Sequence, residues 1–204
     1  MATFRVSNAR IAGLTVAVPE QTSSVQQFAG AADFEAIQKI SASLGIEQRP
    51  TAPRELCASD LCAAAAERLL ERTGWERDSI EVVVFLSQTP DYVLPATACV
   101  LQQRLGLSTG CAAFDVNLGC SGFPYGLWLL SQLISAGQMK RGLLLVGDTL
   151  SRKVSPQDSA TAHLFGDSGT ATAIEFDPAA PEMNFVLGTD GRGARQLREA
   201  LPGF

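Results

Sequence analysis

The chain has 204 residues, of which 46% are hydrophobic and 18% charged, and its formal net charge is −5. This composition excludes a disordered segment, and the acidic balance argues against a nucleic-acid-binding protein, which needs a clustered basic face. Five cysteines without CxxC pairs and a single histidine disfavour a zinc site and a secreted disulfide framework. Residues 1–10 lack an apolar signal core, and no apolar run approaches the roughly 20 residues of a membrane span. We therefore expect a reduced, cytoplasmic α/β enzyme.

Hydrophobic periodicity and turn residues predict helices that alternate with strands. In chain order, the expected elements are a strand over 10–18, helices over 25–44 and 61–72, a strand over 81–87, a helix over 95–105, a strand over 112–116, a helix over 121–134, a strand over 142–147, and a closing pair of strands over 169–176 and 184–189. The run EVVVFLS at 81–87 is apolar throughout, as expected of a strand that is buried on both faces. This order predicts one α/β domain over residues 1–204 with a largely parallel sheet.

The segment 114–127 (FDVNLGCSGFPYGL) contains the strongest candidate for chemistry, Cys120. A short strand leads into the turn before this cysteine, and a helix begins almost directly after it. Unpaired helix N–H groups and the positive end of the helix dipole stabilise a thiolate at such a turn. Gly119 and Gly122 leave room beside the sulfur, and the N–H of Cys120 is placed to stabilise an oxyanion. From spacing alone, two interpretations stay open: a nucleophile, or a glycine-flanked turn that binds phosphate or only packs.

The remaining cysteines, Cys57, Cys62, Cys99 and Cys111, have no such setting. Because free cysteine is among the residues most often buried, we interpret these four as unreactive packing residues.

The segment 114–127 resembles the active-cysteine segment of the β-ketoacyl-acyl-carrier-protein synthase III family, whose relatives include chalcone synthase-like and hydroxymethylglutaryl-CoA synthase enzymes. Further resemblances follow in the family's order along nearly the whole chain. They are Gly45-Ile46 with Arg49, 94–99 (LPATAC), Gly147-Asp148, 164–171 (LFGDSGTA) and Asp190-Gly191.

This resemblance implies a thiolase-like α/β fold, with the chain as the N-terminal half of an αβαβα layered sandwich. It implies that Cys120 accepts an acyl group from a coenzyme A or carrier thioester. The acyl-enzyme would then condense with a malonyl-carrier thioester by decarboxylative Claisen chemistry, as in fatty acid or polyketide-type synthesis. Leu94, Gly119 and Gly122 are the implied substrate-binding residues. The implied partners are an acyl carrier protein and a second copy in a homodimer, and no metal or redox cofactor is implied.

The family's catalytic histidine and asparagine lie in its second half, and we expect this chain, which ends at Phe204, to lack that half. The alternative function is therefore a non-catalytic thiolase-fold subunit, or a half that needs a partner chain to supply both residues. We interpret His163 as structural rather than as a displaced catalytic partner. A nucleotide-binding domain is disfavoured because Val18 is followed by 19–22 (PEQT), which contains no glycine fingerprint.

Departures from the family pattern concern the acyl donor. The family brackets the adenine of coenzyme A with a tryptophan and an arginine, and the matching positions are Lys39 and Ser43. A further arginine before the FGD turn is replaced by Ser159. Without a stacking surface and two charged contacts, the sequence favours a carrier thioester over acetyl-CoA as donor.

At two further places in the sequence, two interpretations are open. Leu94 matches the family position that crosses the dimer interface and closes the partner's acyl pocket. A leucine is narrower than the phenylalanine often found there, so it either admits a longer acyl chain or only packs at the interface. The turn at 166–169 (GDSG) fits close packing better than phosphate binding, because a lone glycine-rich turn is weak support for a phosphate site.

Overall fold

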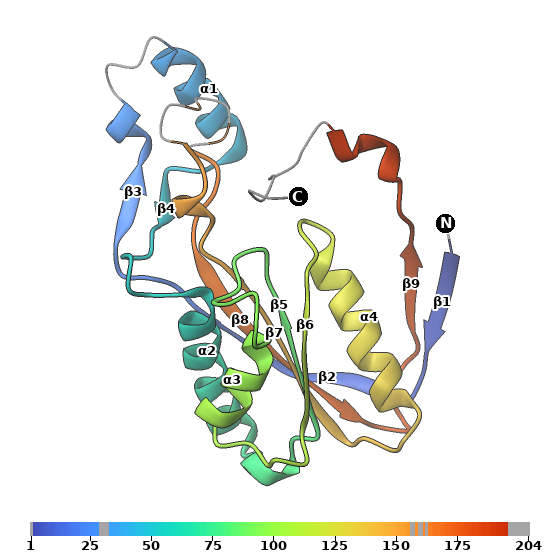
Figure 1. Cartoon of the computed structure of the whole chain (residues 1–204). Coiled ribbons are helices and arrows are strands. Elements are labelled where there is room, and N and C mark those ends of the chain that lie inside the picture. Colours follow the sequence, from blue (N-terminus) through green and yellow to red (C-terminus); the bar gives the residue numbers. More distant parts are fainter. Residues whose placement is uncertain (1, 29–32, 156–157, 159–160, 162, 196–204) are drawn as a thin grey trace.

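A mixed five-stranded sheet organises the chain, and helices cover both of its faces (Figure 1). The computed structural model describes residues 2–28, 33–155, 158, 161 and 163–195. The sheet has the strand order β2 (Ala9–Ala17), β8 (Ser168–Phe176), β7 (Arg141–Asp148), β5 (Val82–Leu86) and β6 (Ala112–Val116). The helices are α1 (Phe34–Leu44), α2 (Ala58–Thr73), α3 (Thr97–Arg104) and α4 (Gly122–Ser135).

Two small antiparallel pairs lie outside the main sheet. They are β1 (Ala2–Val6) with β9 (Met183–Leu187), and β3 (Thr22–Ser24) with β4 (Gln48–Pro50). The first pair lies beside α4 in Figure 1, where the ring of Phe4 packs on that of Trp128 with 4.8 Å between the centroids. Short 3-10 helices cover Val25–Phe28, Arg77–Ser79, Leu150–Arg152 and Gly191–Arg195.

Every residue of the inner strand β5 is buried, as the apolar run predicts. Because successive side chains of a strand point to opposite faces, Val83 and Phe85 join the core under α2 and α3. Val82, Val84 and Leu86 join the core under α4. The strand therefore serves two separate layers of packing and fixes α4 on one side of the sheet.

The predicted parallel sheet is corrected by the observed topology. Only the pairings of β5 with β6 and with β7 are parallel, whereas β8 runs antiparallel to both β2 and β7. The expected closing pair over 169–176 and 184–189 does not form, because β8 lies between β2 and β7 while β9 pairs with β1. Periodicity within a strand does not report the direction of its neighbours, so the sequence could not separate these cases.

Two predicted helices are shorter than expected. The helix expected over 25–44 is a 3-10 turn over Val25–Phe28 followed by α1 from Phe34, and residues 29–32 lie outside the described residues. The helix expected over 95–105 covers only Thr97–Arg104, with Ala96 as the residue that caps its start.

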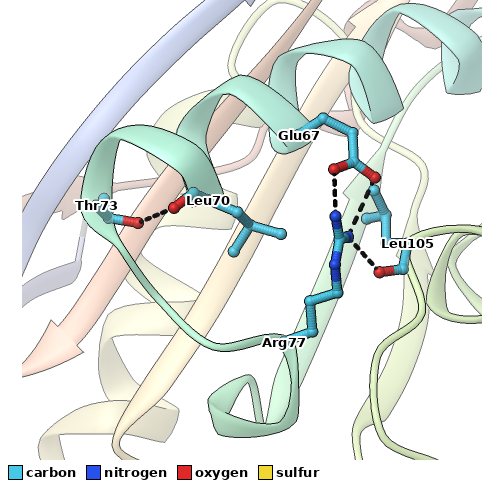
Figure 2. A network of polar contacts seen from close by, with 5 residues as sticks. All are labelled: Glu67, Leu70, Thr73, Arg77 and Leu105. Atoms are coloured by element: carbon cyan, nitrogen blue, oxygen red, sulfur yellow. Dashed lines mark hydrogen bonds and ion pairs between the residues drawn. The ribbon is translucent and has the colours of Figure 1, made fainter.

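A charged contact joins α2 to the end of α3 on the face away from α4 (Figure 2). Arg77 forms a two-pronged ion pair with Glu67, with N···O distances of 3.1 and 2.6 Å. The same guanidinium donates to the carbonyl of Leu105 at 2.6 Å. One side chain therefore holds the loop after α2 against the carbonyl end of α3, whose last carbonyl groups have no intrahelical partner.

Candidate active site

Cys120 lies exposed in the turn between β6 and α4. The N–H of Gly122, the first residue of α4, donates to the carbonyl of Gly119 at 2.7 Å and closes the turn. In the part of the chain that the structure describes, the N–H of Cys120 donates no hydrogen bond. The sulfur and this N–H group therefore lie together at the start of a helix of 14 residues, where the positive end of the helix dipole stabilises a nearby oxyanion.

The two glycines beside Cys120 have different surroundings. A methyl group added at Gly122 would lie 2.5 Å from Cδ2 of the buried Leu86, so this glycine lets α4 pack closely on the sheet. A methyl group added at Gly119 would instead lie 2.9 Å from Nε2 of Gln88, at the tip of an exposed side chain. The sequence indicated both glycines, but only the structure gives Gly122 a packing reason. Substrate binding by either glycine stays a prediction.

A second loop, between β5 and α3, reaches the same end of the sheet. The Oδ1 atom of Asp148, at the end of β7, accepts hydrogen bonds from Ser87 Oγ at 2.9 Å, Gln88 N at 2.7 Å, and Thr89 N and Oγ1 at 3.0 Å. Thr89 Oγ1 in turn accepts from the N–H of Thr149 at 2.9 Å. From the sequence, Asp148 is recognisable only as the end of a strand. Its role in holding this loop could not be predicted, because that role depends on the parallel pairing of β5 with β7.

Leu94 lies in the same loop, immediately before α3. It is 86% exposed, and its neighbours Tyr92 and Val93 are also exposed. The structure thus places Leu94 on the surface in an apolar segment and not against Cys120 within this chain. Its predicted role in closing the acyl pocket of a second copy stays a prediction.

The turn at 166–169 is a buried junction of three chain segments. The carboxylate of Asp167 is fully buried and accepts from the N–H of Ala52 at 2.7 Å, from the N–H of Ser151 at 2.9 Å and from Ser151 Oγ at 2.5 Å. Arg49 donates to the carbonyl of Phe165 at 2.8 Å, and burial lowers the pKa of its guanidinium while Asp167 opposes that shift. These contacts fit the predicted packing role of the turn.

His163 is also buried at this junction, 1% exposed. It packs against residues of β3, β4 and the segment between α1 and β4, and Cys120 is not among these neighbours. This position agrees with the structural interpretation of His163.

The remaining cysteines differ in exposure. Cys62 and Cys111 are buried, Cys57 is half-buried, and Cys99 is exposed. Burial raises the pKa of the Cys62 thiol to about 12 and that of Cys111 to about 11, because a thiolate loses its hydration in an apolar site. Two of the four therefore have surroundings that disfavour the reactive thiolate, as predicted. Cys99 is exposed, whereas the sequence predicted a packing residue at this position.

An open cavity of about 490 Å³ begins beside the cysteine turn. It lies between the start of α4 and the end of β9, and its lining residues include Ser121, Tyr125, Val186 and Thr189. The hydroxyl of Tyr125 donates a hydrogen bond to the carbonyl of Gly188 at 2.8 Å and so joins α4 to the residue that follows β9. No sequence pattern predicts this cavity, because α4 and β9 are about 50 residues apart and meet only in the fold.

The positions at which the family contacts coenzyme A are occupied by Lys39, Ser43 and Ser159. Lys39 and Ser43 are exposed on α1, and Ser159 lies outside the described residues. Among the residues that the structure describes, no three His, Cys, Asp or Glu side chains gather as metal ligands. None of the described helices is both long enough and apolar enough to cross a bilayer.

Comparison with solved structures identifies the fold. A 3-oxoacyl-(acyl-carrier protein) synthase from Burkholderia xenovorans LB400 superposes with a TM-score of 0.91 at 45% identity, over 95% of this chain and 56% of that one. A β-ketoacyl-[acyl carrier protein] synthase III from Thermus thermophilus superposes with a TM-score of 0.82 at 31% identity, over 95% of this chain and 60% of that one. The chain therefore has a thiolase-like α/β fold.

Sequence comparison identifies the family. Residues 114–191, which include Cys120, match the family model of 3-oxoacyl-[acyl-carrier-protein (ACP)] synthase III. A β-ketoacyl-[acyl-carrier-protein] synthase III from Alkalilimnicola ehrlichii is 39% identical over 146 residues, which are 72% of this chain and 45% of that protein. The chain belongs to the 3-oxoacyl-ACP synthase III family. It spans about half the length of the curated relatives it matches.

Proposed function

We propose that this protein is a condensing enzyme of the 3-oxoacyl-ACP synthase III type and that Cys120 is its acyl-accepting nucleophile. The observation that carries the proposal is the position of Cys120, which is exposed at the start of α4 inside the family-matched segment 114–191. Cys62 and Cys111, in contrast, are buried with raised pKa values. Only an accessible thiolate can attack a thioester carbonyl.

The proposed reaction has two steps. The Cys120 thiolate attacks the carbonyl carbon of an acyl thioester, the carbon–sulfur bond to the donor breaks, and the donor thiol leaves with a proton. A malonyl-carrier thioester then loses CO₂, and its carbanion attacks the acyl-cysteine carbonyl. This forms a carbon–carbon bond, releases Cys120 and leaves a 3-oxoacyl carrier. Both steps are redox-neutral, and the free N–H of Cys120 supports the oxyanion formed in each.

The second step needs groups that polarise the malonyl carbonyl. We propose, from the family resemblance, that a histidine and an asparagine of a second half supply them, and that this chain is the N-terminal, cysteine-bearing half. One face of β2 carries exposed apolar side chains, since Leu14 is 48% and Val16 47% exposed. This exposure supports the proposal that a second half packs on that face. Thr15, between Leu14 and Val16, points the other way and donates to the carbonyl of Ala65 in α2.

This exposed face also supports a second candidate function, a subunit that becomes active only with a partner chain. A contiguous apolar surface of this kind marks an interaction site more often than a solvated one. In either case we propose an acyl carrier protein and a second copy of the chain as partners. The substitutions at Lys39 and Ser43 support a carrier thioester as the preferred donor.

The experiment that tests the nucleophile is intact-mass measurement of the chain after incubation with matched acyl-CoA and acyl-carrier thioesters. We expect one acyl adduct, absent in Cys120→Ser and retained in Cys99→Ser, which removes the other exposed thiol. Faster acylation by the carrier thioester would support the donor assignment, and faster acylation by CoA would overturn it.

If a folded sample gives no adduct, Cys120 does not accept an acyl group in this chain alone. That result would favour the subunit function. Condensation is tested separately by adding malonyl-carrier thioester and measuring the 3-oxoacyl product. If acylation occurs without condensation, the nucleophile is confirmed and the second half is required for the carbanion step.

A further inference from the structure

The start of α4, directly after Cys120, has no side-chain cap. Among the described residues, the hydroxyl of Ser121 at the N-cap forms no capping hydrogen bond, and the N–H of Tyr125 reaches the carbonyl of Ser121 only at 3.4 Å. The start of α2, in contrast, has a capping box formed by Cys57 and Asp60. The place of the cysteine turn therefore depends on contacts that the first turn of α4 makes with other elements.

Two contacts hold this first turn. On the side of the sheet, Gly122 packs so closely on Leu86 that an added methyl group would lie 2.5 Å from Cδ2. On the side of the β1–β9 pair, the hydroxyl of Tyr125 donates to the carbonyl of Gly188 at 2.8 Å. Apolar packing has no preferred direction, whereas a hydrogen bond restricts an angle as well as a distance. Tyr125 is thus the contact that orients the helix start.

The acceptor of this bond belongs to a well-ordered segment. Gly188 follows Leu187, the last residue of β9, which pairs with Ala2 in the continuous register of β9 with β1. Thr189 Oγ1 lies 3.4 Å from the Tyr125 hydroxyl oxygen and gives it a second polar neighbour. Because Tyr125 is in the first turn of the helix, a shift of that turn moves the sulfur and the free N–H of Cys120 with it.

We propose that Tyr125 is a positioning residue for acyl transfer to Cys120. Its bond to Gly188 holds the helix start in the orientation in which the Cys120 sulfur attacks a thioester carbonyl while the Cys120 N–H meets the developing oxyanion. Attack on a carbonyl needs both groups aligned, and a misplacement of about 1 Å can lower a rate by about a hundredfold. This inference rests on the proposed function of Cys120 and adds a residue that acts through the helix.

The test uses Tyr125→Phe, which keeps the ring and removes only the hydroxyl. Acylation of Cys120 by a carrier thioester is followed by intact mass over a range of donor concentrations. We expect the maximal acylation rate to fall about three- to tenfold, the range for one net hydrogen bond. The half-saturating donor concentration should stay unchanged, because the bond aligns the reacting groups and does not bind the donor.

A second reaction of the same sulfur separates alignment from loss of structure. Alkylation of Cys120 by iodoacetamide needs an accessible sulfur but no oxyanion contact, so its rate in Tyr125→Phe should stay within about twofold of the wild type. The control variant is Thr73→Val, which also removes a hydroxyl donor to a backbone carbonyl, that of Leu69 at 2.9 Å. It lies where α2 leads into the start of β5, whereas Cys120 follows the end of the parallel strand β6. Both rates should be unchanged in this control.

Wild-type acylation in Tyr125→Phe would overturn the positioning role and leave the nucleophile in place. A parallel fall of acylation and alkylation, or an equal slowing of acylation in Thr73→Val, would also overturn it, because the hydroxyl would then only stabilise the fold. Thermal unfolding of each variant measures that contribution directly. If folded wild-type protein gives no acyl adduct, both the nucleophile and this inference are overturned.

Discussion

The carboxylate of Asp115 on β6 accepts a hydrogen bond from the backbone N–H of Thr97, the first residue of α3, at 2.7 Å. Its second oxygen accepts from the N–H of Ala98, also at 2.7 Å. One strand residue thereby satisfies two of the unpaired N–H groups at the start of a helix. It also joins the strand that leads to Cys120 with the loop that carries Gln88.

We expect Asp115→Ala to lower the free energy of unfolding by about 2 kcal/mol, since two charge-assisted bonds to buried backbone groups are lost. Asp115→Asn keeps one acceptor oxygen and should lose roughly half as much. Urea unfolding followed by circular dichroism measures both. Asp78→Ala, at an exposed acidic residue, is the matched control, and equal effects of Asp115→Ala and this control would disprove the capping role.

Gly169 on β8 lies where α2 packs closely on the sheet. A methyl group added there would lie 2.4 Å from the backbone nitrogen of Cys62 and 2.5 Å from the carbonyl carbon of Leu61, both in α2. Backbone atoms cannot rotate away, so we expect Gly169→Ala to destabilise the fold by about 3 kcal/mol or to prevent folding. Gly191→Ala, with no atom within 4 Å of the added methyl group, should be close to neutral. A thermal melt of the two variants compares them, and similar melting temperatures would contradict this packing.

The cysteines should separate into reactive and protected groups on alkylation of the native protein. We expect Cys120 and Cys99 to react with iodoacetamide first, because both are exposed. Cys62 and Cys111 should react more slowly by roughly a factor of a hundred, because burial both restricts access and raises their thiol pKa values. Peptide mapping after timed quenching measures each site. Early labelling of Cys62 in folded protein would show that the α2 core opens readily.

The same pKa shifts predict a loss of stability at alkaline pH. A thiol ionises in the unfolded chain near pH 9, whereas the folded-state pKa values of Cys62 and Cys111 are about 12 and about 11. Between these values the folded state binds more protons, so stability is complete below about pH 9 and falls as the pH rises toward 11. Urea midpoints at pH 8 and pH 10 should show a larger decrease for the wild type than for Cys62→Ala, compared as differences between the two pH values. An equal decrease in both would contradict the assignment.

Arg77 should contribute more than its ion pair with Glu67 suggests. Glu67→Gln removes an exposed charge pair and should lower stability by less than about 1 kcal/mol. Arg77→Ala also removes the donor to the carbonyl of the buried Leu105 and should cost about 1–2 kcal/mol. Urea unfolding of both variants at low and high salt distinguishes the contributions, because only the ion pair is screened. Equal losses in the two variants would show that the Leu105 bond contributes nothing.

The sequence by itself determined most strands and helices of the main sheet and the position of the nucleophile candidate. The apolar run at 81–87 predicts a buried strand, and the observed β5 covers Val82–Leu86. The strand predicted over 112–116 and the helix over 121–134 are confirmed within one residue at each end. These features are local, because side-chain periodicity and glycine or proline punctuation act over a few residues. The turn containing Cys120 follows directly from them.

The tertiary structure alone decided which strands are neighbours and what surrounds the turn. The antiparallel place of β8, the loop held by Asp148 and the approach of Gln88 to Gly119 all join segments far apart in the chain. Such contacts depend on how two helix-covered faces pack at once, which no local pattern encodes. The position of Cys120 in a turn before a helix is therefore a property of the sequence, whereas the surroundings of this turn are a property of the fold.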